Sequence, residues 1–156
     1  MTKPSSTIIA ADAPKRIGSR YPTPHDELCK NRSKAILGDV FGLDQFGVNL
    51  VTLAPGAWSS QRHWHVNEDE FVYVVEGEIT LSDNDGDHLM TPGMCAGFKA
   101  NNGNGHCLKN LTDKAVIYLE VGTRAKIEQG YYSDIDMQFV KDDKGNRFLK
   151  KDGGAF

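Results

Sequence analysis

The sequence predicts an all-β fold in which antiparallel sheets form a sandwich or barrel. Short apolar runs begin at Phe46, they recur at regular spacing, and turn signals such as Asn84-Asp85-Gly86 separate them. The predicted strands cover residues 48–53, 61–65, 71–75, 78–82, 88–90, 106–110 and 115–121.

The composition is that of one compact domain. The chain has 156 residues, 39% of them hydrophobic and 25% charged, which is enough to bury one core. We predict an N-terminal arm over residues 1–45 that packs on the barrel or on a dimer partner, a β-barrel domain over 46–122, and a C-terminal extension over 123–156. Four prolines interrupt regular structure in the arm, where residues 23–28 could start one short helix.

Charge and hydropathy exclude several classes of function. A net charge of -3 argues against nonspecific nucleic-acid binding, which needs clustered Lys and Arg. No apolar stretch approaches the roughly 20 residues of a membrane span, and the first residues lack the apolar core of a signal peptide. We expect a soluble cytoplasmic protein with no nucleic-acid or membrane partner. Cys29, Cys95 and Cys107 are unrelated in spacing, which indicates free thiols.

Three histidines and a glutamate form the most informative pattern. In an extended strand His63 and His65 point to one face while Trp64 points to the other. Glu70 opens the next apolar run after a short polar interval that resembles a hairpin connection, and His106 lies in a later run. Imidazole nitrogens with one carboxylate oxygen suit borderline divalent ions. We therefore predict one divalent transition metal per chain, which could be Fe, Mn, Ni, Co or Zn.

The residues around this pattern resemble a known family. Gly56, His63, His65, Glu70 and Gly77 look like the first motif of the cupin superfamily, in its small single-domain form. A looser second motif surrounds His106, and its members are Gly86, Pro92, Gly93 and Asn110. The segment before His106 is longer than in the simplest members and contains a Gly- and Asn-rich loop over residues 100–105. The resemblance covers residues 48–122.

The resemblance implies a fold and an assembly. Cupins are double-stranded β-helices, also described as jelly rolls, so the family agrees with the all-β prediction. The ligand set that it implies is His63, His65, Glu70 and His106. Cupins often dimerise by exchanging terminal strands, so we expect a homodimer.

Residues other than the ligands are harder to assign. Four protein ligands leave about two positions open on a six-coordinate ion, as a catalytic site requires. Ser59 and Gln61 share the strand parity of His63, and Asn110 shares that of His106, so these three are candidates to line the pocket. Along residues 115–121 we expect the apolar residues to face inward and Glu120 to face solvent. No catalytic acid or base is evident.

Two classes of function fit these observations. The first is a small metalloenzyme with an oxygenase-like reaction on a small polar or acidic molecule. Some cupins of this size are sugar-phosphate isomerases, but no evident cluster of Arg and Lys lines the predicted barrel to hold a phosphate. The second class is a non-enzymatic protein that binds or senses a small molecule through its metal.

Overall fold

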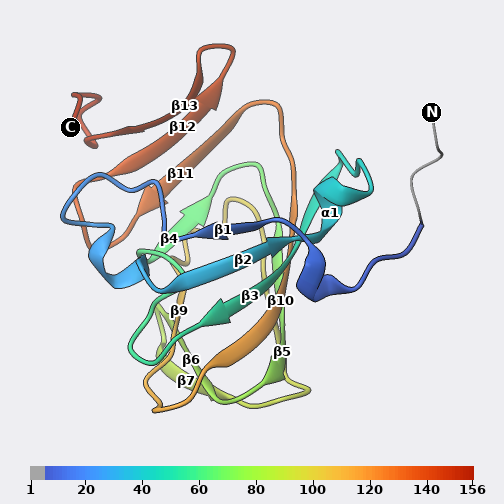
Figure 1. Ribbon diagram of the computed structural model, residues 1–156. Coiled ribbons are helices and arrows are strands. Elements are labelled where there is room, and N and C mark those ends of the chain that lie inside the picture. The colour runs from blue at the N-terminus through green and yellow to red at the C-terminus, as the bar shows by residue number, and fades with distance from the viewer. Residues whose placement is uncertain (1–5) are drawn as a thin grey trace.

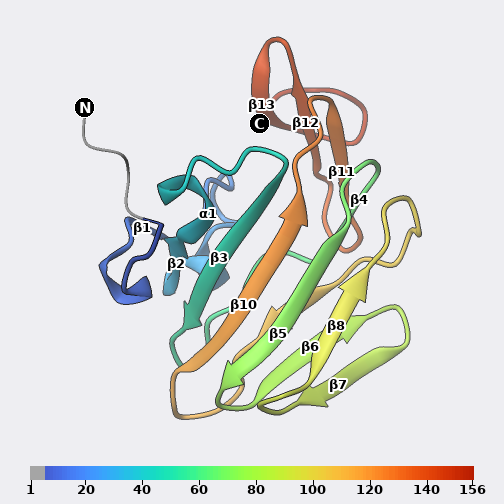
Figure 2. The ribbon, with the colours of Figure 1, turned by 90° about the vertical axis from the view of Figure 1, so that its right-hand side faces the viewer.

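The computed structural model describes residues 6–156, which form two layers of antiparallel β-strands (Figure 1). One layer is a six-stranded sheet in the order β1-β2-β3-β10-β5-β8. Its strands are β1 (Lys15–Ile17), β2 (Arg32–Ile36), β3 (Phe46–Leu53), β10 (Val116–Thr123), β5 (Glu70–Glu76) and β8 (Cys95–Phe98). Figure 2 shows β3, β10, β5 and β8 side by side.

The other layer has two parts. One part has the order β7-β6-β9, and the second has the order β13-β12-β11-β4. Their strands are β7 (Gly86–Met90), β6 (Ile79–Asp83), β9 (Cys107–Lys109), β13 (Gly145–Leu149), β12 (Gln138–Asp142), β11 (Glu128–Tyr132) and β4 (His63–His65). A bridge between His63 and His106 joins the two parts. The predicted all-β jelly roll is thus confirmed.

Helices are short in the described residues. They are the α-helix α1 (Leu37–Val40) and the 3-10 helices η1 (Ala10–Asp12) and η2 (Glu27–Cys29). The short helix predicted over residues 23–28 is therefore wrong in its first half, where the chain forms a turn before η2. No helix in residues 6–156 is long and apolar enough to cross a lipid bilayer.

Each of the seven predicted strands has a counterpart in the structure, and the turn at Asn84-Asp85-Gly86 connects β6 to β7 as predicted. Gly86 has a φ of 115° there, a conformation that favours glycine. The connection over residues 66–69 is different, because β4 pairs with β11 while β5 pairs with β10 and β8. It crosses between the two layers instead of forming the expected hairpin.

The core lies between the two layers. The side chains of β10 show which face of the six-stranded sheet points into it. Val116 and Tyr118 are buried, and Tyr118 pairs in register with the buried Val51 and Val74. The alternate residues of β10, among them Leu119, therefore lie on the outer face. The expectation that Ile117, Leu119 and Val121 would face the interior is wrong, because they belong to the apolar outer surface of the six-stranded sheet.

That outer surface exposes large side chains. Phe71, Tyr73 and Val75 on β5 are each more than 40% exposed, and Leu119 is in register beside Tyr73. Contiguous apolar surface of this kind is common at protein interfaces. The homodimer stays a prediction.

The three cysteines are free, and their burial differs. Cys29 and Cys107 are buried and Cys95 is exposed. Burial raises the pKa of the Cys107 thiol to about 11, which suppresses the reactive thiolate at neutral pH. We expect N-ethylmaleimide to label only Cys95 in the native protein and all three thiols in guanidinium chloride, as measured by intact mass. A native Cys95→Ser variant that still takes up label would contradict this prediction.

Candidate metal centre

Four side chains from three segments converge between the two layers. They are His63 and His65 on β4, Glu70 at the start of β5, and His106 just before β9. The Nε2 atoms of His63 and His65 are 3.1 Å apart. Glu70 Oε2 lies 2.8 Å from His106 Nε2 and 3.9 Å from His63 Nε2, and Glu70 Oε1 lies 3.6 Å from His65 Nε2. The structure thus brings together the four predicted ligands.

Backbone pairing and packing fix these side chains. Strand alternation on β4 turns Trp64 away from the two histidines and onto Tyr131 of β11, with ring centroids 5.0 Å apart. Two backbone hydrogen bonds join His63 and His106, which sets the third imidazole beside the first two. Phe98 stacks on the ring of His106 at 3.5 Å between centroids. The donor atoms are therefore held in place by the fold.

The protonation states of His63 and Glu70 suit metal binding. His63 Nδ1 lies 2.9 Å from the carbonyl oxygen of Gln61, so it can donate its proton there and leave the lone pair of Nε2 free. Burial lowers the pKa of His63 to about 3, which keeps the ring neutral. Burial alone would raise the pKa of Glu70, but the neighbouring imidazoles hold it well below its usual value. Neutral imidazoles and an ionised carboxylate are the forms that bind metals.

The donor set fits a shared divalent ion. The ligand atoms of His63, Glu70 and His106 all lie within 4.8 Å of one another. Glu70 Oε2 is buried, and its 2.8 Å contact with His106 Nε2 is not aligned as a hydrogen bond, so this oxygen has no hydrogen-bond donor among residues 6–156. Buried carboxylate oxygens normally have a partner. An ion between the three imidazoles and Glu70 would provide one.

A second group of charged side chains lies behind His65. Glu128 of β11 is 1% exposed, and its carboxylate accepts hydrogen bonds from the backbone N–H groups of Val66, Asn67 and Gln129. Its Oε1 also lies 3.7 Å from His65 Nδ1, and Glu68 Oε2 lies 3.9 Å from the same nitrogen. Burial alone would lower the pKa of His65, but these carboxylates and Glu70 outweigh it and raise the pKa. Glu128 thus supports both the segment that follows β4 and the side chain of His65.

The three residues predicted to line the pocket have different positions. Ser59 lines the cavity around the donor cluster. Gln61 instead donates from Nε2 to the carbonyl oxygen of His25 and ties the N-terminal arm to the barrel. The predicted pocket position of Gln61 is wrong because β4 begins only at His63. The preceding residues form bends, so their side chains do not follow strand alternation.

Asn110 is fully buried and is not among the residues that line this cavity. Its side chain donates to the carbonyl oxygens of Leu53 and Lys114 and accepts from the backbone N–H and hydroxyl of Thr112. We expect Asn110→Ala to destabilise the protein by about 2–4 kcal/mol, because it leaves several buried polar groups unpaired. Urea unfolding would measure the loss. An Asn110→Ala protein of unchanged stability would contradict this role.

The donor cluster opens into a cavity of about 420 Å³. Its lining includes Tyr118 and Glu120 of β10, so the expected solvent position of Glu120 is wrong. Glu120 Oε1 accepts hydrogen bonds from Lys34 Nζ at 2.7 Å and from Asn49 Nδ2 at 3.0 Å. The inner face of β10 is polar at this point because it borders a cavity instead of the core.

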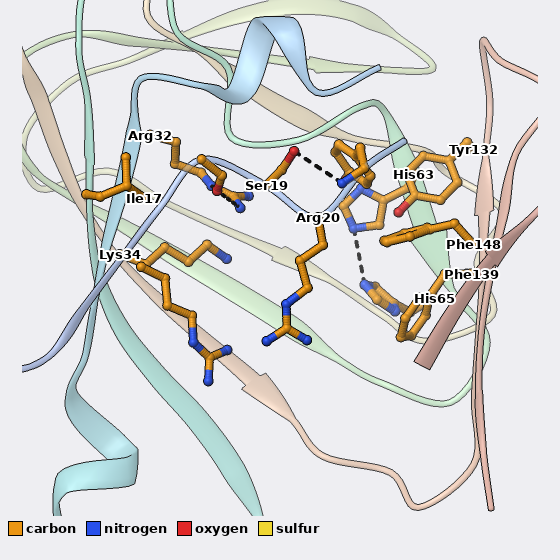
Figure 3. A pocket seen from close by; sticks show the side chains of 14 residues that line it. Ile17, Ser19, Arg20, Arg32, Lys34, His63, His65, Tyr132, Phe139 and Phe148 are labelled. Carbon is orange, nitrogen blue, oxygen red and sulfur yellow. Dashed lines mark hydrogen bonds between the residues drawn. The ribbon is translucent and has the colours of Figure 1, made fainter. Parts of the chain in front are cut away.

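A second cavity of about 560 Å³ adjoins the first and shares several lining residues with it, including His63, His65 and Lys34. We call it the entrance chamber. Figure 3 shows Arg20 and Lys34 on one side of it and the rings of Tyr132, Phe139 and Phe148 on another. Among residues 6–156, four cationic side chains and no carboxylate line the chamber, and the cations are Arg16, Arg20, Arg32 and Lys34.

These cations correct the expectation that no cluster of Arg and Lys would line the barrel. All four come from β1, β2 and the segment that follows β1. On β2, Lys34 pairs in register with the buried Val51, so its side chain is on the inner face of the sheet. The sequence offered a signal in the alternation Arg32-Ser33-Lys34-Ala35, which has period two. This alternation did not predict the cationic lining, because polar residues of a strand are normally assigned to the solvent face.

Fold and site together define a jelly-roll protein with a cluster of His and Glu side chains that could hold a divalent metal. The chain belongs to the cupin superfamily, since the Cupin domain family matches residues 49–122 and a solved structure from a cupin superfamily covers 96% of the chain at 47% identity. No protein of curated function matches the sequence significantly.

Several solved structures are similar to this chain. A sugar phosphate isomerase from a cupin superfamily, from Silicibacter pomeroyi, is 47% identical, covers 96% of each chain and has a TM-score of 0.93. A structure from Acidithiobacillus ferrooxidans, provisionally described as a sugar phosphate isomerase, is 26% identical, covers 76% of each chain and has a TM-score of 0.72. The polyketide cyclase RemF from Streptomyces resistomycificus is 21% identical over 79% of this chain and 80% of its own, with a TM-score of 0.63, and it shows the fold alone.

Proposed function

We propose that this protein is a metal-dependent isomerase of a small phosphorylated sugar. The observation that carries the proposal is the entrance chamber, where four cations, and no carboxylate of the described residues, adjoin a His and Glu donor cluster. A phosphate ester is the small acidic molecule that such a lining favours. The names of the similar structures from S. pomeroyi and A. ferrooxidans support the same substrate class. This evidence favours the isomerase alternative over the oxygenase-like reaction that the sequence suggested.

In this proposal His63, His65, Glu70 and His106 hold one divalent transition metal per chain. The ion would polarise a carbonyl or hydroxyl oxygen of the sugar. Isomerisation also moves a proton between adjacent carbons, which requires a base in the cavity. Glu120 is suited to this task because Lys34 and Asn49 engage only its Oε1, which leaves Oε2 without a partner among residues 6–156.

Two buried tyrosines, Tyr118 and Tyr132, also line the cavities, and their hydroxyl groups are hydrogen-bonding groups instead of bases. Burial holds the pKa of the Tyr118 and Tyr132 hydroxyls well above its usual value. Both hydroxyls therefore stay protonated at neutral pH. The Tyr118 hydroxyl can donate a hydrogen bond to a sugar oxygen, whereas that of Tyr132 is already paired with the Tyr21 hydroxyl. Tyr118 lines the cavity of the donor cluster and Tyr132 lines the entrance chamber.

The test is turnover by protein reconstituted separately with Fe(II), Mn(II), Co(II), Ni(II) and Zn(II). Pentose and hexose phosphates, as aldoses and as ketoses, would be followed by NMR beside the matched unphosphorylated sugars, with oxygen uptake recorded in parallel. We expect interconversion of an aldose phosphate and a ketose phosphate without oxygen uptake. Binding of phosphates without any turnover would support the non-enzymatic alternative, and oxygen uptake with unphosphorylated acids would support an oxygenase.

A further inference from the structure

The four cations of the entrance chamber differ in what their charged groups contact. Arg32 donates from Nε and Nη2 to the carbonyl oxygen of Gly18, at 3.2 and 2.6 Å, and from Nη1 to that of Ser59. Lys34 forms an ion pair with Glu120 at 2.7 Å. These two side chains are therefore already engaged within the chain.

Arg16 and Arg20 are not engaged in this way. In the described part of the chain, neither guanidinium group has a hydrogen bond or an ion pair. Both line the entrance chamber, and Figure 3 shows the side chain of Arg20 extending into its open space. Two uncompensated positive charges in one chamber attract an anion.

We propose that Arg16 and Arg20 form the phosphate-binding subsite of this protein. The inference rests on the proposed function and names the part of the substrate that the arm would bind. Guanidinium groups present paired N–H donors that match phosphate oxygens, and two of them balance the charge of a phosphate dianion. Arg32 and Lys34 are assigned a structural part instead, because their donors have partners already.

The contacts of Arg32 prepare this subsite before a ligand arrives. The Gly18 N–H donates to the Arg32 carbonyl at 2.8 Å, while the Arg32 side chain holds the Gly18 carbonyl. Arg16 also pairs in register with Lys34 across β1 and β2. The backbone is thus fixed at Arg16 and at Gly18, two residues before Arg20, which lowers the cost of ordering this segment on binding.

The positions of the two arginines orient the substrate. Arg16 lines both cavities, whereas Arg20 lines only the entrance chamber. A phosphate bound between them would lie on the entrance side, and the carbon chain of the sugar would extend past His65 toward Glu70. Phe139 and Phe148 line the same chamber and offer an apolar surface to the C–H groups of the sugar. The inferred substrate is therefore a sugar monophosphate whose phosphate is at the end remote from the reacting carbonyl.

The test compares an Arg16→Gln/Arg20→Gln double variant with a Lys126→Gln/Lys144→Gln double variant, which removes the same charge from exposed positions outside both cavities. Metal-loaded proteins would be titrated calorimetrically with inorganic phosphate. A second titration would use the unphosphorylated form of any sugar phosphate that is turned over, as the ligand that lacks the phosphate group. We expect the affinity for inorganic phosphate to fall about 100-fold in the arginine double variant, which is about tenfold for each lost arginine. The control should bind like the wild type. The melting temperatures of both double variants should be unchanged, because neither Arg16 nor Arg20 has a side-chain partner within residues 6–156.

The outcomes separate this inference from the proposed function. Phosphate binding that depends on Arg16 and Arg20, without isomerisation of any sugar phosphate, would leave the subsite standing and refute the isomerase. Isomerisation with an unchanged KM in the arginine variant would refute the subsite and leave the isomerase. Equal losses in the arginine variant and in the lysine control would indicate only a general charge effect and would also refute the subsite.

Discussion

Replacing His106 by alanine should lower metal affinity at least about 100-fold, because one of four ligands and its position beside Glu70 are lost together. His106 Nε2 lies 2.8 Å from Glu70 Oε2, and a water molecule in place of the ring would not reproduce a neutral nitrogen ligand. Metal bound to the native state adds stability by mass action, so the rise in melting temperature on adding metal should disappear as well. Metal content by plasma mass spectrometry and thermal melts with and without metal would measure both effects.

The matched control for this experiment is His88→Ala. His88 is exposed on β7 and contacts Asp83, away from the donor cluster. It should keep wild-type metal content and the full response of the melting temperature. Should His106→Ala retain a full equivalent of tightly bound metal, the ligand assignment would be wrong.

The second large effect is expected at Glu128, where an alanine should destabilise the protein by about 3–5 kcal/mol. The carboxylate accepts from three backbone N–H groups and is 1% exposed, so its removal leaves buried donors without a partner. Two of these N–H groups, those of Val66 and Asn67, belong to the segment between His65 and Glu70, and the same carboxylate lies near His65 Nδ1. Metal affinity should therefore also fall, by about 10- to 100-fold.

Glu128→Gln separates the two effects and guards against a variant that does not fold. Its amide oxygen can still accept from the backbone, so it should recover much of the stability, whereas the charge beside His65 stays absent. Urea unfolding of the metal-free proteins and competitive metal titrations would be compared with Glu78→Ala, which removes an exposed carboxylate. If Glu128→Gln matched the wild type in metal affinity, the charge on Glu128 would have no part in positioning His65.

Much of the donor cluster could be predicted from the sequence, because the positions of these side chains depend mainly on local strand geometry. Strand alternation puts His63 and His65 on one face over a three-residue strand, and the cupin-like motif supplies Glu70 and His106. Strand alternation did not give the positions of Gln61 and Asn110. Gln61 precedes the start of β4 at His63, and Asn110 is not among the residues that line the cavity. The alternation of side chains between two faces can be used only within the residues that form the strand.

The residues that shape the cavities were harder to predict, since the rule linking apolar residues to the interior reverses beside a polar cavity. On β10 the inward positions near the donor cluster hold Tyr118 and Glu120, and on β2 they hold Arg32 and Lys34. The strands β1 and β2 are short and polar, so hydrophobic periodicity did not indicate them. Their place in the sheet depends on pairing with β3, which is a tertiary interaction.

The pairing of β4 with β11 bears on the order in which the molecule is completed during synthesis. The strand that carries His63 and His65 has its ladder partner in Glu128–Tyr132, which is translated after all four donor residues. Figure 1 shows β11 beside β4, continuing into the terminal hairpin of β12 and β13. A nascent chain that ends at Gly122 would contain all four donors and still lack the strand that aligns two of them. Tight metal acquisition should therefore be a late step that follows release of the C-terminal strands, and a truncated chain should exchange its metal freely.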